Sequence, residues 1–98
     1  VLMTHIGGYP SKYKKEIETE IQSFKPDIYI CGHSHILKIM YDSNYQLIHI
    51  NPGAAGKEGF HQKRTIVLLS IKNTKIHNIK VVELGLRAKL TKPIDRFK

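Results

Sequence analysis

The first half of the chain carries two short apolar runs separated by a stretch of helical periodicity. Residues 1–3 and 27–31 are dense in apolar side chains, which is typical of buried strands. Between them, residues 12–24 place apolar side chains at the spacing of one helix face, and Ser11 is a candidate N-cap. Pro26 ends this helix, because proline disfavours helical backbone in the residue before it. The pattern predicts a strand–helix–strand unit.

In the second half, apolar positions recur with a period of two, as they do in half-buried strands. Residues 36–41 and 46–50 flank a polar stretch and predict a hairpin. A turn of small residues precedes two further expected strands, at 64–71 and 76–84. The order of elements indicates an α/β fold class, with one βαβ unit followed by mostly antiparallel strands.

Composition narrows the class of protein. The chain has 98 residues, of which 41% are apolar and 24% charged, so it is not disordered or collagen-like, and it allows one small domain. No apolar run approaches the roughly 18–20 residues that span a bilayer, and no secretory signal is visible. We therefore expect a cytoplasmic protein without a membrane segment. Cys31 is the single cysteine, which excludes a disulfide framework and a multi-cysteine zinc site.

Charge adds little to the functional picture. The formal net charge is +8, and half of it falls in residues 87–98, which contain five basic residues and one acidic residue. We interpret this segment as a basic C-terminal tail that aids solubility, although such tails can also bind anionic partners. No basic stripe alternates with aromatic residues, so a nucleic-acid groove is not supported.

The strongest chemical signal is the run Gly32-His33-Ser34-His35, directly after the second predicted strand. Ligands of open α/β sheets bind at the carboxyl ends of the strands. A glycine there lets the backbone turn and approach a ligand closely. Two imidazoles one residue apart can bind one metal ion or two adjacent ones, and imidazole suits zinc, iron, nickel and manganese. Taken alone, such a pair is equally well explained as two surface histidines.

The position of His5 favours a metal site over a pair of surface histidines. This residue follows the first predicted strand, and parallel strands joined by a helical crossover end on the same side of a sheet. His5, His33 and His35 should therefore converge, which favours a metal site. His49 could face either solvent or the site, whereas His61 and His77 are expected in a polar loop and on the surface. We interpret Cys31 as a small buried filler.

These motifs resemble those of calcineurin-like metallophosphoesterases, in particular the small bacterial and archaeal phosphodiesterases. The resemblance rests on the strand ending in Thr4-His5, on Gly32-His33-Ser34-His35, and on Asn51-Pro52-Gly53. It implies a two-sheet α/β/β/α sandwich with two divalent metal ions (manganese favoured over iron, zinc and nickel). By this match His5 and His33 bind the second metal and His35 the first, and Gly32 and Asn51 lie at the substrate or around the ligands.

The departures from the family are also informative. The family's Asp-x-His, Gly-Asp and Gly-Asn-His motifs, which carry the bridging carboxylate and the proposed acid histidine, do not occur in this sequence. Residues 1–86 therefore resemble only the C-terminal half of the domain, with no catalytic acid of their own. Closely spaced metal ions need a carboxylate between them, so we expect an active phosphoesterase as the intact protein and an inactive 98-residue segment.

Two alternatives stay open at this stage. The first is a non-catalytic interaction scaffold on the same fold, against which the three retained histidines argue. The second is a small α/β domain with incidental histidines. Because the first predicted strands are apolar throughout, we expect one sheet face to need a partner, either the missing half or another copy of the chain, and hence a homo-oligomer. The expected substrate is a phosphate ester.

Overall fold

The computed structural model describes residues 1–87 of the chain. The chain divides into two compact units, Val1–Gly53 and Ala54–Lys98, and each is described here by itself. The predicted basic tail, residues 87–98, lies outside the described residues except for Arg87. No helix in the described part of the chain is long and apolar enough to cross a membrane.

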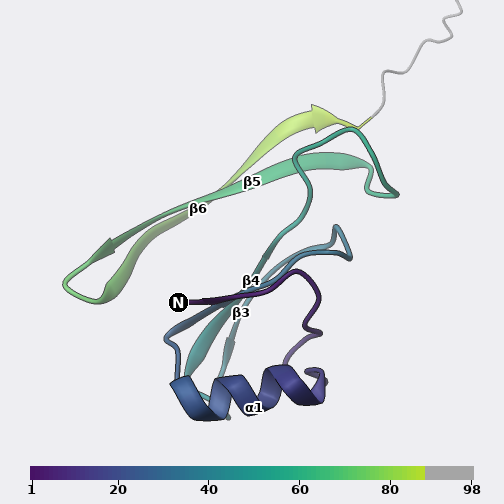
Figure 1. Ribbon diagram of the computed structural model, residues 1–98. Coiled ribbons are helices and arrows are strands. Elements are labelled where there is room, and N and C mark those ends of the chain that lie inside the picture. Colours follow the sequence, from purple (N-terminus) through teal and green to yellow (C-terminus); the bar gives the residue numbers. More distant parts are fainter. Residues whose placement is uncertain (88–98) are drawn as a thin grey trace, which may run out of the picture. The chain divides into compact units, whose positions relative to one another are not determined.

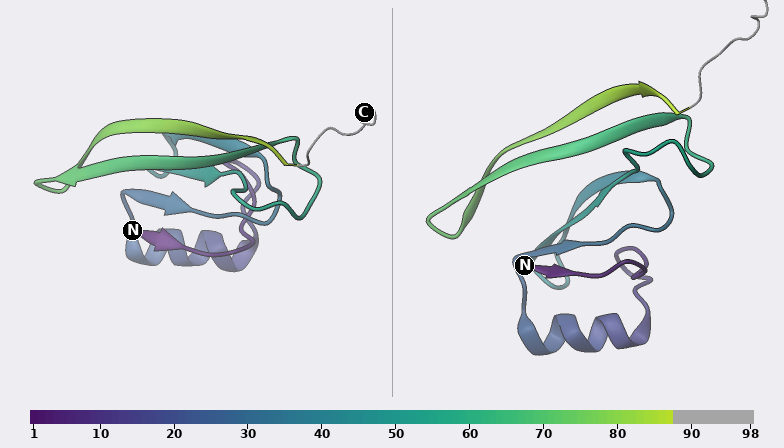
Figure 2. Two further views of the ribbon diagram at one scale, coloured as in Figure 1. Left: turned by 90° about the horizontal axis from the view of Figure 1, so that it is seen from above. Right: turned by 45° about the horizontal axis from the view of Figure 1, so that its top comes forward.

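The first unit is a four-stranded sheet with one helix. Its sheet has the strand order β1-β2-β4-β3. The elements are β1 (Leu2–Met3), α1 (Lys15–Phe24), β2 (Ile28–Ile30), β3 (Leu37–Asp42) and β4 (Leu47–Pro52). Strands β1 and β2 are parallel, as are β2 and β4, whereas β3 and β4 form an antiparallel hairpin. The predicted βαβ unit and the hairpin after it are both confirmed, and α1 lies along one face of the sheet (Figures 1 and 2).

The core of this unit lies between α1 and the sheet. Ile17 and Ile21 are the buried residues of the helix, one turn apart, as its apolar spacing predicted. They pack against Tyr29, Cys31 and Leu47, and partly buried side chains close the edges of this cluster: Leu2, Tyr13 and Tyr45. Tyr29 and Leu47 are fully buried, so the centre of the sheet carries the packing that holds the helix in place.

The helix begins later than the sequence predicted. Its first residue is Lys15, and Lys14 precedes it without a side-chain capping bond. Ser11 is not the N-cap, because its backbone has a φ of 71°, outside the extended region that an N-cap adopts. The preceding loop satisfies its own backbone instead: the Lys12 amide donates to Tyr9 O and the Lys14 amide to Gly7 O.

Three apolar residues that were expected inside the protein are exposed. Val1 and Met3 are 70% and 67% exposed, because β1 is the edge strand and their side chains alternate away from half-buried Leu2. Phe24, at the last position of α1, is 67% exposed. The prediction of a buried first strand is therefore correct for one of its faces only.

The second unit contains an antiparallel pair, β5 (Lys63–Lys72) and β6 (Lys75–Leu86), which form a sheet of their own. Each strand extends one or two residues further at either end than its alternating pattern predicted. The register shifts between Arg64 and Thr65 and again between Leu68 and Ser70. Many of its apolar side chains are exposed, namely Leu68, Ile71, Ile79, Val81, Leu84 and Leu86. With β5 and β6 in a second sheet, the two-sheet α/β class expected from the sequence is confirmed.

The helix–sheet core can be tested with two substitutions in α1. Ile21→Ala, at a position that is 1% exposed, should lower the free energy of unfolding by about 2–5 kcal/mol. Phe24→Ala, at the 67% exposed end of the helix, should change it by about 0.5 kcal/mol or less. Urea unfolding followed by tyrosine fluorescence reports on this unit, since all five tyrosines precede residue 46. Equal effects of the two substitutions would contradict the assignment of the core face.

Candidate metal centre

Two backbone hydrogen bonds bring the histidine-bearing segments together. Beyond the ends of β1 and β2, the Thr4 amide donates to Ile30 O at 3.0 Å, and the Gly32 amide donates to His5 O at 2.9 Å. These bonds extend the parallel pairing of the strands by two further steps. As a result His5 and the start of the Gly32–His35 segment lie side by side at the carboxyl end of the sheet, as the order of elements predicted.

His5 and His33 form the centre of the candidate site. Nδ1 of His33 lies 3.3 Å from Nε2 of His5, and the rings meet edge to face with centroids 5.1 Å apart. Two imidazole nitrogens bound to one tetrahedral ion at 2.0–2.1 Å would be separated by roughly 3.3–3.4 Å. Both side chains are exposed, so an ion can reach them. The structure thus brings these two histidines together at the spacing of two ligands of one metal.

His35 does not complete a set of ligands with them. No group of three or more His, Cys, Asp or Glu side chains within residues 1–87 is spaced to hold a metal ion. The expected approach of His5 and His33 is confirmed, and the role of His35 as a further ligand stays a prediction.

The backbone around His33 and His35 is strained. His33 and His35 have φ values of 70° and 63°, in the left-handed region that costs a non-glycine residue about 1–2 kcal/mol. Gly32, which was expected to be needed for a close approach, is not in that region. A Cβ added to Gly32 would lie 3.8 Å from His5 O, which is an ordinary contact. The turn is therefore made by the histidines themselves.

A side-chain network holds this strained segment. Asn51 is 1% exposed, and its Nδ2 donates to Gly32 O at 3.2 Å and to Ser34 Oγ at 3.1 Å. The Asn51 Oδ1 accepts the amide of Gly53 at 3.0 Å. The hydroxyl of Tyr9 also donates to Ser34 Oγ, at 2.8 Å. The sequence motif predicted that Asn51 lies near the site. It predicted no role for Tyr9 or Ser34, because only the fold brings these two residues together.

Gly7 is a second residue whose importance the sequence did not reveal. A Cβ at this position would lie 1.5 Å from the Tyr29 hydroxyl, a distance at which something must move. That hydroxyl is already fixed, since it lies 2.6 Å from Thr4 Oγ1. The loop after β1 can therefore cross the buried Tyr29 only with a glycine at this point.

His49, which the sequence left between solvent and site, is instead buried in the core of the first unit. Its ring lies 5.8–6.0 Å, centroid to centroid, from the rings of Tyr9, Tyr13 and Tyr29. Burial lowers the pKa of His49 below its ordinary value, and the positive charge of Lys38 adds to this effect, while the carboxylate of Asp42 opposes it. Neutral His49 therefore serves as a core residue.

Buried polar atoms surround His49. Its Nδ1 has no hydrogen-bond partner among the described residues, and the Tyr13 hydroxyl and Asp42 Oδ2 are buried next to each other. Burial, followed by the neighbouring Asp42 carboxylate, raises the pKa of Tyr13. Cys31 is buried as predicted, and its thiol lies 3.6 Å from Gly8 O, to which it donates. Burial also raises the pKa of this thiol, which disfavours the thiolate form that a nucleophilic cysteine needs.

The two remaining histidines lie in the second unit. His61 is in the loop before β5, where its Nε2 lies 2.9 Å from Gly56 O. His77 is exposed on β6, as its position in a late strand predicted. Neither belongs to a metal-binding group within the described residues.

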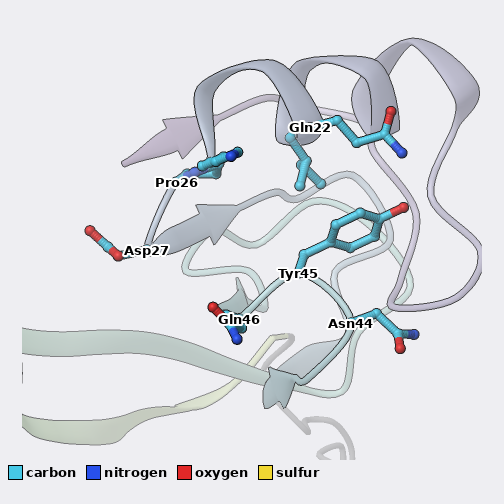
Figure 3. A pocket seen from close by; sticks show the side chains of 8 residues that line it. Gln22, Pro26, Asp27, Asn44, Tyr45 and Gln46 are labelled. Atoms are coloured by element: carbon cyan, nitrogen blue, oxygen red, sulfur yellow. The ribbon is translucent and has the colours of Figure 1, made fainter.

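Two hollows of the first unit differ in their chemistry. A pocket of about 160 Å³ includes His33 in its lining, together with the loop after β1, the rest of Cys31–Ser34, and Asn51. A larger one, of about 490 Å³, lies at the opposite, amino-terminal end of β2 and β4 (Figure 3). Its lining includes Asp27, Tyr45 and Gln46 but no histidine. The candidate metal site therefore lies at the smaller pocket, which His33 and Asn51 line.

The family model for the calcineurin-like phosphoesterase superfamily domain matches residues 1–74, so the chain belongs to this superfamily. No curated protein matched the chain.

Several solved structures resemble the chain, among them two that are described here. The first is a single mutant of Vps29 from Entamoeba histolytica, with a TM-score of 0.51, 17% identity, and coverage of 82% of this chain and 53% of that one. The second is Vacuolar Protein Sorting 29 from Cryptosporidium parvum, with a TM-score of 0.41, 16% identity, and coverage of 82% and 49%. The chain thus spans about half the length of these proteins. The first likeness confirms the fold.

The buried position of His49 predicts a pH-dependent stability. The folded state holds the pKa of His49 below 6.5, so the unfolded chain takes up the proton first as the pH falls. The free energy of unfolding should therefore decrease below about pH 6.5, by at most about 1.4 kcal/mol per pH unit from this group. Urea unfolding between about pH 8 and pH 5 should show this slope in the His77→Gln control and a smaller slope in His49→Gln. Equal slopes in the two variants would contradict the assignment.

Proposed function

We propose that this chain provides the histidine side of a dinuclear metal centre in a phosphodiesterase, of the kind found in small bacterial and archaeal relatives. The observation that carries the proposal is the 3.3 Å separation of His5 Nε2 and His33 Nδ1 in a member of the calcineurin-like phosphoesterase superfamily. Exposed imidazoles at that spacing suit one divalent ion, with manganese favoured over iron, zinc and nickel.

The proposal gives each histidine a role. His5 and His33 hold one ion through the two facing nitrogens, and His35 is a ligand of the other ion. Gly32 and Asn51 fix the segment that carries His33 and His35, through the bond from Asn51 Nδ2 to Gly32 O. When bound, such ions polarise a phosphoryl oxygen and lower the pKa of a bound water, which suits hydrolysis of a phosphate ester.

Carboxylate ligands must come from elsewhere in this scheme. Neutral imidazoles do not offset the repulsion of two divalent cations about 3.5–4 Å apart, and no third ligand joins His5 and His33 within residues 1–87. We infer that the carboxylates and the general acid lie on the part of the superfamily fold that this chain does not cover, or on a second copy of the chain. Exposed Val1 and Met3 on the edge strand β1 suit such a partner.

A non-catalytic interaction scaffold is the second candidate function. It is favoured by the exposed apolar side chains of β5 and β6, which exceed what a solvated strand pair needs. The two functions differ in metal binding, because a scaffold needs no ion and can keep the two imidazoles together by the hydrogen bond between them.

Metal titration tests the proposal. Calorimetric titration of the chain with Mn²⁺ and Zn²⁺ should detect one weak site, and His33→Ala should abolish it because no neighbouring ligand replaces the lost nitrogen. His77→Ala, which removes an exposed histidine of β6, is the matched control and should bind as the unmodified chain does. Binding that survives His33→Ala, or that fails equally in His77→Ala, would contradict the assignment.

In the assembled phosphoesterase, the same ligands should control turnover. His33→Ala and His35→Ala should each lower hydrolysis of a chromogenic phosphodiester at saturating Mn²⁺ by about a hundredfold or more, which exceeds the effect of losing a group that only orients a ligand. Unchanged turnover in both variants would show that these histidines are not ligands and would favour the scaffold.

A further inference from the structure

Ser34 lies between the two histidines of the strained segment, and its hydroxyl collects hydrogen bonds from three parts of the first unit. The Tyr9 hydroxyl donates to Ser34 Oγ at 2.8 Å from the loop after β1. Asn51 Nδ2 donates at 3.1 Å from β4, and the Ile36 amide donates at 3.2 Å from the start of the hairpin. One hydroxyl thus connects three backbone segments.

The direction of these bonds follows from the chemistry of the donors. The Asn51 amide is fixed, because its Oδ1 accepts the Gly53 amide, so its Nδ2 must face the acceptors Gly32 O and Ser34 Oγ. A backbone amide can only donate. A hydroxyl has two lone pairs, so the three donors more than fill the acceptor capacity of Ser34 Oγ, and two of them share one lone pair.

Tyr9 is itself held from two sides. Its ring lies 5.8 Å from the buried ring of His49, and the ammonium group of Lys38 lies 5.4 Å from its centroid. Lys38 pairs with Asn51 across β3 and β4, so two of the groups that act on Ser34 are linked through the sheet. The hydroxyl of Tyr9 is therefore presented to Ser34 by ordered neighbours.

Because of its position in the chain, Ser34 can hold the strained backbone on either side of it. The residues on either side of it, His33 and His35, both have left-handed backbone. Strained backbone persists only where the surrounding structure determines it. Ser34 stands between the two strained residues, and the bonds to its side chain tie this point of the segment to the loop after β1 and to β4.

We infer that Ser34 is a positioning residue for the metal ligands, held by Tyr9 and Asn51, and that its acceptor capacity sets the geometry of His33 against His5. The inference rests on the proposed metal-binding function. It assigns Ser34 and Tyr9 the role of orienting the residues that bind the ion. In the sequence motif, Ser34 is recognisable only as the residue between two histidines.

The test compares four variants of the chain. Ser34→Ala removes the acceptor, Ser34→Thr keeps a hydroxyl, and Tyr9→Phe removes one donor. Ser43→Ala, at an exposed serine of the β3–β4 turn, is the control. Two quantities are measured: Zn²⁺ affinity by calorimetry, and the hydrogen-exchange rate of the Ile36 amide in the metal-free chain, with thermal melting to establish that each variant is folded.

Ser34→Ala is expected to weaken Zn²⁺ binding about ten- to a hundredfold, the usual effect of removing a group that orients a ligand, and to speed Ile36 exchange. Ser34→Thr should restore both quantities, and Tyr9→Phe should weaken binding by a smaller factor. Folded Ser34→Ala with unchanged Zn²⁺ affinity would overturn the inference, whatever its Ile36 exchange rate. If Ser34→Ala does not fold, unchanged Zn²⁺ affinity in Tyr9→Phe would overturn it.

The two proposals fail in different ways. If the unmodified chain binds no Zn²⁺, the metal-binding function fails, while Ile36 exchange in the metal-free variants still decides whether Ser34 holds the segment. If the chain binds Zn²⁺ and Ser34→Ala binds it equally well, the function stands and the positioning role of Ser34 is wrong.

Discussion

The candidate site depends on two hydrogen bonds that continue a parallel strand pair beyond its last regular residues. The bonds from the Thr4 amide to Ile30 O and from the Gly32 amide to His5 O carry the pairing of β1 and β2 into the loops that follow. These backbone bonds fix the two loops relative to each other. They place His5 next to His33 without the help of side-chain contacts. The crossover through α1 makes this pairing parallel, and the Ile21–Tyr29–Leu47 core holds the crossover in place.

The same core constrains the loop that carries His5. Gly7 crosses the fixed hydroxyl of Tyr29, where a Cβ would clash, and the chain then turns so that Tyr9 reaches Ser34. Tyr9 in turn rests against the buried ring of His49. The packing around His49 and the position of the Gly32–His35 segment are therefore linked through Tyr9.

The sequence predicted what depends on periodicity and chain order. Apolar runs located β1 and β2, helical spacing identified Ile17 and Ile21 as core residues, and the crossover rule brought His5 to His33. It did not predict what depends on contacts between distant residues. Ser11 was not recognised as a turn residue because the loop's bonds to Gly7 O and Tyr9 O form only in the fold. The burial of His49 likewise depends on three tyrosines that approach it from other elements.

The central claim is that His5 Nε2 and His33 Nδ1 are two ligands of one ion, and ¹⁵N NMR of the histidine rings during a Zn²⁺ titration tests it most directly. We expect the resonances of these two nitrogens to shift together, at the same Zn²⁺ concentration, while those of buried His49 and exposed His77 stay in place. If Zn²⁺ moved the His77 resonances equally, or left both His5 and His33 unchanged at saturation, the pair would be a contact between surface histidines and the proposed metal centre would be contradicted.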